Sequence, residues 1–125
     1  MRLTSSRQEL ASKLALVGRA ASSKSTIQIL SHVLVTAGPD GVELAATDME
    51  LSLRVPLDAD VAEGGSVAIP RLAGDIVRTM SDGDVSVEHR ANEGVTTVAG
   101  GRSSFSLNCM QAADFPELPA AAEGA

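Results

Sequence analysis

The side chains with the clearest chemical potential in this sequence are six cations confined to two short stretches. They are Arg7, Lys13, Arg19, Lys24, Arg71 and Arg78. The 125-residue chain as a whole is acidic, with 16 Asp and Glu residues, ten Lys and Arg residues and a formal net charge of −6, and only four of its cations lie outside this set. Basic groups gathered on an acidic protein attract a polyanion locally, while the remaining surface repels it. We therefore expect these side chains to neutralise phosphate groups.

The cationic stretches carry no cluster of Asn, Gln and Arg of the kind that reads base edges. Binding through phosphates alone is insensitive to base sequence, so we expect loose contacts to nucleic acid without sequence preference. A second interpretation stays open from charge alone, since basic helix faces are often merely solvated. Only two aromatic residues, Phe105 and Phe115, occur in the chain. This excludes a stacking platform for single strands.

Residues that could catalyse a reaction or bind a metal do not form a recognisable motif. The two histidines, His32 and His89, and the single Cys109 lack the spacing of zinc ligands. No G-x-S-x-G motif accompanies the abundant serines, and Gly100-Gly101-Arg102 is no P-loop because it lacks the G-x-x-x-x-G-K-[ST] pattern and lies between predicted strands. We expect no catalytic residue, no metal and no cofactor, and hence no enzyme.

Composition also indicates where such a chain works. One cysteine rules out an intrachain disulfide, which favours a reducing compartment. The first residues lack the apolar core of a signal peptide, and no apolar run approaches the ~20 residues of a membrane span. We expect a cytoplasmic domain without a membrane partner.

Two helices are expected to position the cations. Ser6 with Glu9 three residues later is typical of a capping box, and Leu10, Leu14 and Val17 follow at helical spacing to about Arg19. Pro70 fits the first position of a second helix. Its apolar residues Leu72, Ile76 and Met80 are four apart, and at 100° per residue Arg71 and Arg78 lie on the opposite face. Each helix should therefore have a core face and a basic face, with both core faces turned into one shared core.

Strand-like patterns fill the remainder of the chain. Clean alternation is found in Met49–Leu57, and Gly38–Gly41 is a strong turn signal. The acidic segment 58–65 is interpreted as a loop. The predicted strands are 2–5, 29–37, 42–46, 49–57, 66–69, 84–90, 94–99 and 102–109. The order βαββββαβββ predicts an α+β fold with antiparallel sheets and two helices on one side.

Several segments resemble one known family, the bacterial DNA sliding clamp, which is the beta subunit of DNA polymerase III. The segments are Lys24–Leu30, Thr47–Glu50, Asp75–Arg78 followed by Asp82-Gly83, Arg102–Leu107 and Ala112–Pro119. They resemble the family's R-x-T-x-P-I-L loop, its T-D-L-E turn, its second helix with its exit, its R-x-x-F-x-L strand and its A-x-D-[FY]-P-x-L exit segment. The resemblance covers residues 1 to about 119 in order, and Gln28 stands where the family usually has proline.

The resemblance implies the DNA-clamp fold and a function without catalysis. In this family two three-domain subunits form a ring whose helices line a hole for double-stranded DNA. The ring is a processivity factor that tethers the replicative polymerase. By position, Lys24 matches the DNA-contacting loop, and Arg19, Arg71 and Arg78 lie on or beside the pore helices. With Lys13 and Arg7 they make up the expected DNA-binding set.

The same resemblance implies the chain's other partners and its boundaries. The strand with Arg102, Phe105 and Leu107 matches the one that meets a second clamp subunit. Polymerase and clamp loader bind the family through domains beyond this chain. We expect a clamp N-terminal domain at 1–119 and the start of an interdomain linker at 120–125, as a fragment of a three-domain chain.

Two other functions are weighed against the clamp. A non-catalytic β-rich protein-interaction module would bind partners by adding a strand to an exposed edge and would show no dependence on DNA. A small hydrolase would need a pocket containing both Ser and His. Whether the helices present Arg19, Lys24, Arg71 and Arg78 together on one side of the fold separates these alternatives.

Overall fold

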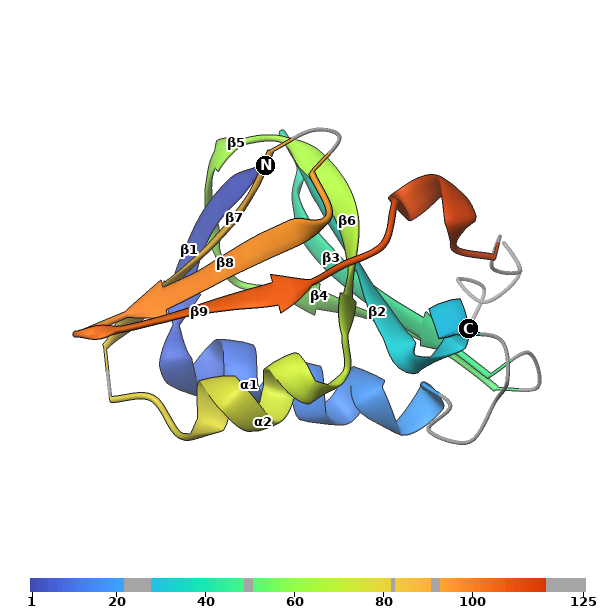
Figure 1. Ribbon diagram of the computed structural model, residues 1–125, viewed down its shortest axis with the longest axis horizontal. Coiled ribbons are helices and arrows are strands. Elements are labelled where there is room, and N and C mark those ends of the chain that lie inside the picture. The colour runs from blue at the N-terminus through green and yellow to red at the C-terminus, as the bar shows by residue number, and fades with distance from the viewer. Residues whose placement is uncertain (22–27, 49–50, 82, 91–92, 117–125) are drawn as a thin grey trace.

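The described part of the chain forms nine strands, arranged in two antiparallel sheets (Figure 1). The computed structural model describes residues 1–21, 28–48, 51–81, 83–90 and 93–116. The first sheet has the order β5 (Asp60–Glu63), β1 (Arg2–Ser6), β7 (Asp84–His89), β8 (Val95–Gly100) and β9 (Ser103–Asn108). The second has the order β4 (Ser52–Leu57), β3 (Gly41–Thr47), β2 (His32–Gly38) and β6 (Gly65–Pro70).

The two helices lie side by side across one end of the sheets (Figure 1). They are α1 (Arg7–Val17) and α2 (Leu72–Arg78), and short 3₁₀ turns follow at Gly18–Ala20, Gln28–Ser31 and Ala112–Asp114. The predicted α+β class, with antiparallel sheets and both helices on one side, is confirmed. The predicted cap is also present, because Ser6 Oγ accepts the backbone N–H of Glu9 at 3.1 Å.

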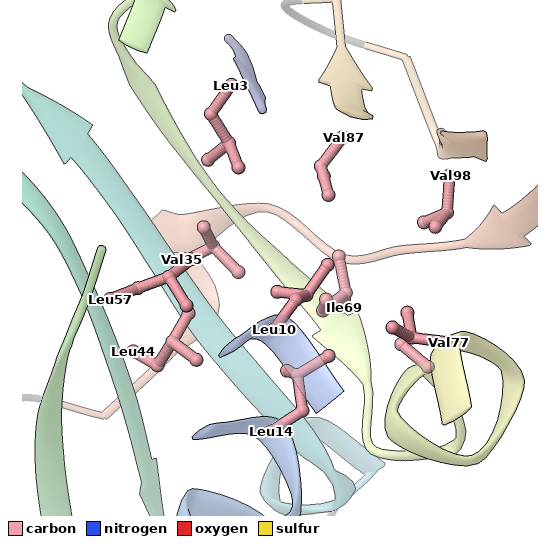
Figure 2. Close-up of a pocket in the computed structure, with 11 residues that line it drawn as sticks. Leu3, Leu10, Leu14, Val35, Leu44, Leu57, Ile69, Val77, Val87 and Val98 are labelled. Atoms are coloured by element: carbon pink, nitrogen blue, oxygen red, sulfur yellow. The ribbon is translucent and has the colours of Figure 1, made fainter. Parts of the chain in front are cut away.

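Aliphatic side chains from both sheets and both helices meet in one core (Figure 2). Leu3, Val87 and Val98 enter it from the first sheet, and Val35, Leu44, Leu57 and Ile69 enter it from the second. Leu10, Leu14 and Val77 close it from the helices. The void left between these groups is about 10 Å³, about the smallest space that holds one water, and its lining offers no polar partner. This interior is packing, and it has no room for a ligand.

The N-terminal strand lies inside its sheet, although it is the first strand made. Strand β1 pairs with β5 on one side, through Leu3 and Val61, and with β7 on the other, through Leu3 and Val87. Both neighbours are far along the chain. The outer strands of this sheet are β5 and β9.

Strand β5 corrects the interpretation of residues 58–65 as a loop. Asp60–Glu63 pairs antiparallel with β1, and Val61 packs partly buried against the core. The acidic side chains of this segment gave it the composition of a loop. They are tolerated in a strand because β5 is at the sheet edge, where Asp60 and Glu63 reach solvent.

Helix α2 is rotated relative to its predicted orientation. Ala73, Val77 and Met80 are buried, Ile76 is half-buried, and Leu72 is 55% exposed. The reason is the close approach of α2 to α1, since a Cβ added at Gly74 would lie 3.3 Å from Leu14 Cβ. With α2 this close to α1, the first side chain that α2 turns into the core is the small Ala73. The expectation for Leu72 was therefore wrong.

Candidate nucleic-acid interface

A groove runs between α1 and α2 on the side of the helices away from the sheets. It encloses about 300 Å³. Small side chains make it possible, because Ala11, Ala15 and Gly18 of the first helical segment face Gly74 of α2. Its full lining is Ala11, Leu14, Ala15, Gly18, Arg19, Arg71, Leu72, Gly74, Asp75 and Arg78. Three arginines thus line one groove with a single acid among them.

The core contacts of α1 determine that Arg19 points outward. Leu10, Leu14 and Val17 are buried, so residues on the opposite side of the helix face solvent. Arg19 follows in the 3₁₀ turn Gly18–Ala20 and is exposed. Its guanidinium group can therefore meet a ligand that lies along the groove.

The second helix supplies the other two cations. Buried Ala73 and Val77 turn Arg71 and Arg78 to solvent, and seven residues of helix bring these two within about 20° of each other. The backbone N–H of Arg71 donates to Ser31 O at 3.0 Å, which fixes the start of the helix. No ion pair engages the side chain of Arg71 or Arg19 within the described ranges. Both are available to an anion.

Asp75 is the acid of the groove. Its Oδ1 accepts from Arg78 Nη2 at 3.0 Å, one turn along α2. The two side chains are 64% and 68% exposed, so water surrounds this pair. Arg78 is therefore shared between the groove and a carboxylate on its own helix.

Two members of the predicted DNA-binding set, Arg7 and Lys13, do not line this groove. Arg7 Nη1 donates to Arg78 O at 3.2 Å, and the Arg7 backbone N–H donates to Gly83 O at 2.8 Å. Arg7 thus supports the C-terminal end of α2, where a cation is favoured. The structure gives it a contact within the fold that the charge count did not reveal.

Lys13 faces the turn between β4 and β5. Its Nζ donates to Glu9 Oε2 at 2.9 Å, and the same carboxylate oxygen accepts the backbone N–H of Asp58 at 2.9 Å. The Asp58 N–H is the main reason that the pKa of Glu9 is lowered, and Lys13 lowers it further against a small opposing effect of burial. This flank of α1 is bonded to the sheet.

Lys24, matched to the family's DNA-contacting loop, lies outside the described residues. Its assignment stays a prediction. The clamp and its alternatives differ in whether Arg19, Lys24, Arg71 and Arg78 lie together. Three of these four residues, Arg19, Arg71 and Arg78, line one groove on one side of the fold.

The predicted subunit-interface residues lie on and before the edge strand β9. Phe105 pairs with Val98 across the ladder and is 36% exposed, whereas Leu107 is 8% exposed and belongs to the core. Arg102 is exposed in the turn before the strand. Phe105 is thus partly exposed on an edge strand, whereas Leu107, two residues further along the same face of β9, is buried in the core.

The residues considered for catalysis are in structural positions. His32 and His89 are buried, and His89 Nε2 is 2.9 Å from Glu93 O, where it donates. In the described part of the chain no group of three His, Cys, Asp or Glu side chains could hold a metal ion. Neither helix there is long and apolar enough to cross a bilayer.

Sequence reasoning missed two features of the groove. It assigned Leu72 to the core, although this side chain lines the groove beside the arginines. It also did not predict the ion pair between Asp75 and Arg78. The i, i+3 spacing of Asp75 and Arg78 could have indicated their ion pair.

The structural class of this protein is a two-sheet α+β domain with paired helices and a basic groove between them. Comparison with known proteins identifies the class further. The family model for the DNA polymerase III beta subunit, N-terminal domain, matches residues 1–119. The chain belongs to this family.

Curated relatives agree with that assignment. The chain is 33% identical to the beta sliding clamp of Synechocystis, over 95% of this chain and 32% of the relative. It is 34% identical to the beta sliding clamp of Micrococcus luteus, over 95% and 38%. The homologue GriR of Streptomyces muensis is 35% identical, over 95% and 32%. The chain thus spans about a third of the length of these relatives.

Solved structures give the same fold. The DNA polymerase sliding clamp of Caulobacter crescentus superposes with a TM-score of 0.90 at 31% identity, over 96% of this chain and 33% of that chain. The sliding clamp of Bacillus subtilis gives 0.88 at 26% identity, over 95% and 33%.

Proposed function

We propose that this chain acts as part of a processivity factor in DNA replication, in a ring-shaped clamp that encircles duplex DNA and tethers the replicative polymerase. The observation that carries the proposal is the groove between α1 and α2. Three exposed arginines line it on one side of a chain whose net charge is −6. Membership of the DNA polymerase III beta subunit family supports the same function.

The proposed contacts involve phosphates and no base edges. Arg19 and Arg71 are free of ion pairs within the described residues, and guanidinium groups bind phosphate oxygens in paired hydrogen bonds. Lys24, five residues after Arg19, is proposed as a further contact. Binding of this kind is weak and independent of sequence, as a ring that must slide requires. Retention on DNA then comes from closure of the ring, and the protein needs no chemistry of its own.

Closure is proposed to involve strand β9. Its outer backbone edge is unpaired in the described residues, since β8 is its only neighbour in the sheet. A second clamp subunit would add a strand there and cover Phe105, with Arg102 at the rim and Leu107 on the same face of the strand. An exposed aromatic at an open edge is otherwise a site of unwanted association.

The remaining partners are proposed to bind beyond this chain. Polymerase and clamp loader would contact parts that correspond to the other two thirds of the relatives. We place the protein in the cytoplasm, where a replication clamp meets DNA.

Titration of a labelled duplex of mixed sequence at several salt concentrations tests the interface. We expect binding near or weaker than the ~10⁻⁴ M end of the non-specific range. Two to four phosphate contacts predict a slope of about −1.8 to −3.6 for log K against log salt. The double variant Arg19→Glu, Arg71→Glu should abolish detectable binding for every duplex sequence.

The matched control is Arg54→Glu, Arg90→Glu, which makes the same change in net charge with two exposed arginines that do not line the groove. It should lose much less affinity. Equal losses in the two double variants would show that net charge, and not the groove, governs binding. No dependence on duplex in any variant would favour the β-rich interaction module.

A further inference from the structure

The groove that is expected to bind phosphate contains its own competitor. Asp75 Oδ1 accepts from Arg78 Nη2 at 3.0 Å and lines the same groove as Arg19 and Arg71. We propose that Asp75 weakens the binding of this domain to duplex DNA, because its carboxylate withholds Arg78 from DNA phosphates. This inference rests on the proposed function, whose site it deepens.

The ion pair between Asp75 and Arg78 contributes little to the stability of the fold. The Asp75 and Arg78 side chains are 64% and 68% exposed, and ion pairs in water contribute little to stability. The pair of Lys13 with Glu9 differs, because the Glu9 carboxylate also accepts the backbone N–H of Asp58 and so joins α1 to the sheet. Asp75 makes no comparable bond to another element in the described residues. What remains for folding is its favourable position in the first turn of α2.

Competition follows from the geometry of the pair. A phosphate that binds Arg78 must displace the Asp75 carboxylate or approach beside it, and in the second case the two anions repel each other. Either way Arg78 contributes less to DNA binding than Arg19 or Arg71. A ring that moves along DNA passes through a series of bound positions. Where the contacts at each position are weak and similar in strength, the free-energy barriers between neighbouring positions are low. An acid in the groove thus favours sliding over retention at one register.

Removing the carboxylate should release Arg78 to the duplex. For Asp75→Asn we expect affinity about two- to fivefold tighter at low salt. A phosphate newly neutralised by Arg78 also releases its counterions, so the slope of log K against log salt should steepen by up to about 0.9. The matched control is Asp60→Asn, which makes the same change in charge on the edge strand β5, at an exposed residue that does not line the groove. It should leave the slope unchanged.

A double-mutant cycle with Arg78→Gln tests whether the effect passes through Arg78. In the Arg78→Gln background, Asp75→Asn should have only the small effect of Asp60→Asn. The same gain with and without Arg78 would overturn the competition, because repulsion acting over distance would then account for it. A lower melting temperature for Asp75→Asn with unchanged affinity and slope would also overturn it and would leave Asp75 as a helix-stabilising residue.

Failure of this inference is distinguishable from failure of the proposed function. If Arg19→Glu, Arg71→Glu abolishes binding while Asp75→Asn behaves like Asp60→Asn, the proposed interface stands and the role of Asp75 is wrong. If the double variant binds duplex as the unchanged protein does, the groove is not the DNA interface, and the inference fails together with the function.

Discussion

The two flanks of α1 carry charged side chains in opposite situations. On one flank the Glu9 carboxylate accepts from Lys13 Nζ and from the backbone N–H of Asp58, and so joins the helix to the turn between β4 and β5. On the other flank the helix meets α2 across alanine and glycine, and the arginines at the groove point to solvent. A count of cations along the sequence treats both flanks alike. The difference shows that a cation is available to a ligand only where the fold leaves it without a partner.

The largest expected change is in the free energy of unfolding, and it should differ between the buried face and the solvent-facing side of α1. Leu10→Ala removes a side chain that is 3% exposed, and should lower the free energy of unfolding by about 2–5 kcal/mol. Leu16→Ala, at a position 40% exposed, should change it by less than about 0.5 kcal/mol. Urea denaturation of the two variants measures both. Similar losses would mean that α1 is not seated on the core as described.

The bonded flank should respond to loss of charge. Glu9→Gln weakens the bonds from Asp58 N and Lys13 Nζ, and should lower the free energy of unfolding by about 1–2 kcal/mol at neutral pH. Glu43→Gln, an exposed position on β3, serves as control and should have almost no effect. Equal effects would show that the Glu9 carboxylate is not a link between helix and sheet.

The same carboxylate predicts a pH dependence. The pKa of Glu9 in the folded protein is lowered from its ordinary value of 4.5, chiefly by the Asp58 N–H. A lowered folded pKa means that the ionised group stabilises the fold fully above 4.5, and that this contribution is lost as pH falls through the folded value. The stability gap between the unchanged protein and Glu9→Gln should therefore narrow below pH 4.5. A gap that widens in acid would contradict the direction of the shift.

One substitution is expected to raise the free energy of unfolding, because it removes a buried polar atom that has no hydrogen-bond partner among the described residues. Thr96 is fully buried on β8, and its Oγ1 has no hydrogen-bond partner among the described residues. Thr96→Val keeps the shape and removes the unsatisfied hydroxyl, so it should raise the free energy of unfolding by about 1 kcal/mol. Thr97→Val, on the opposite face of the strand, should gain less. Destabilisation by Thr96→Val would indicate a partner for the hydroxyl.

The smallest effects on stability should separate two arginines of the predicted set. Arg7→Gln removes a donor to Arg78 O and should cost about 0.5–1 kcal/mol, with the salt dependence of DNA binding unchanged. Arg71→Gln should leave stability within about 0.5 kcal/mol and reduce the salt slope by about 0.9. Parallel measurements of unfolding and duplex titration give all four numbers. If Arg7→Gln reduced the salt slope and Arg71→Gln did not, Arg7 and not Arg71 would be the residue that contacts DNA.

The sequence predicted those features that depend on neighbours in the chain. The Ser6 cap and the turn that joins β2 to β3 follow from local side chains, and the latter is completed by Gly41 at φ 122°. It did not predict features that depend on distant segments. The rotation of α2 follows from contact between Gly74 and Leu14, β5 needs β1 as its partner, and Arg7 meets a carbonyl 71 residues away. The sequence predicted that the helices share a basic side, but which residues line the groove depends on these contacts between distant segments.

The position of β1 between two later strands has a consequence for synthesis on the ribosome. Leu3 cannot pair with Val61 until the ribosome has made about half of the domain, and it cannot pair with Val87 until most of the domain is made. At about 5–20 residues per second, translation from β1 to β7 takes roughly 4 to 17 s. During that interval β2, β3 and β4 can pair as consecutive hairpins, whereas β1 has no strand of its sheet to pair with until β5 is made and only that one neighbour until β7 follows. The first sheet is therefore completed late, and a ribosome stalled before residue 84 would leave the β7-facing edge of β1 available to chaperones.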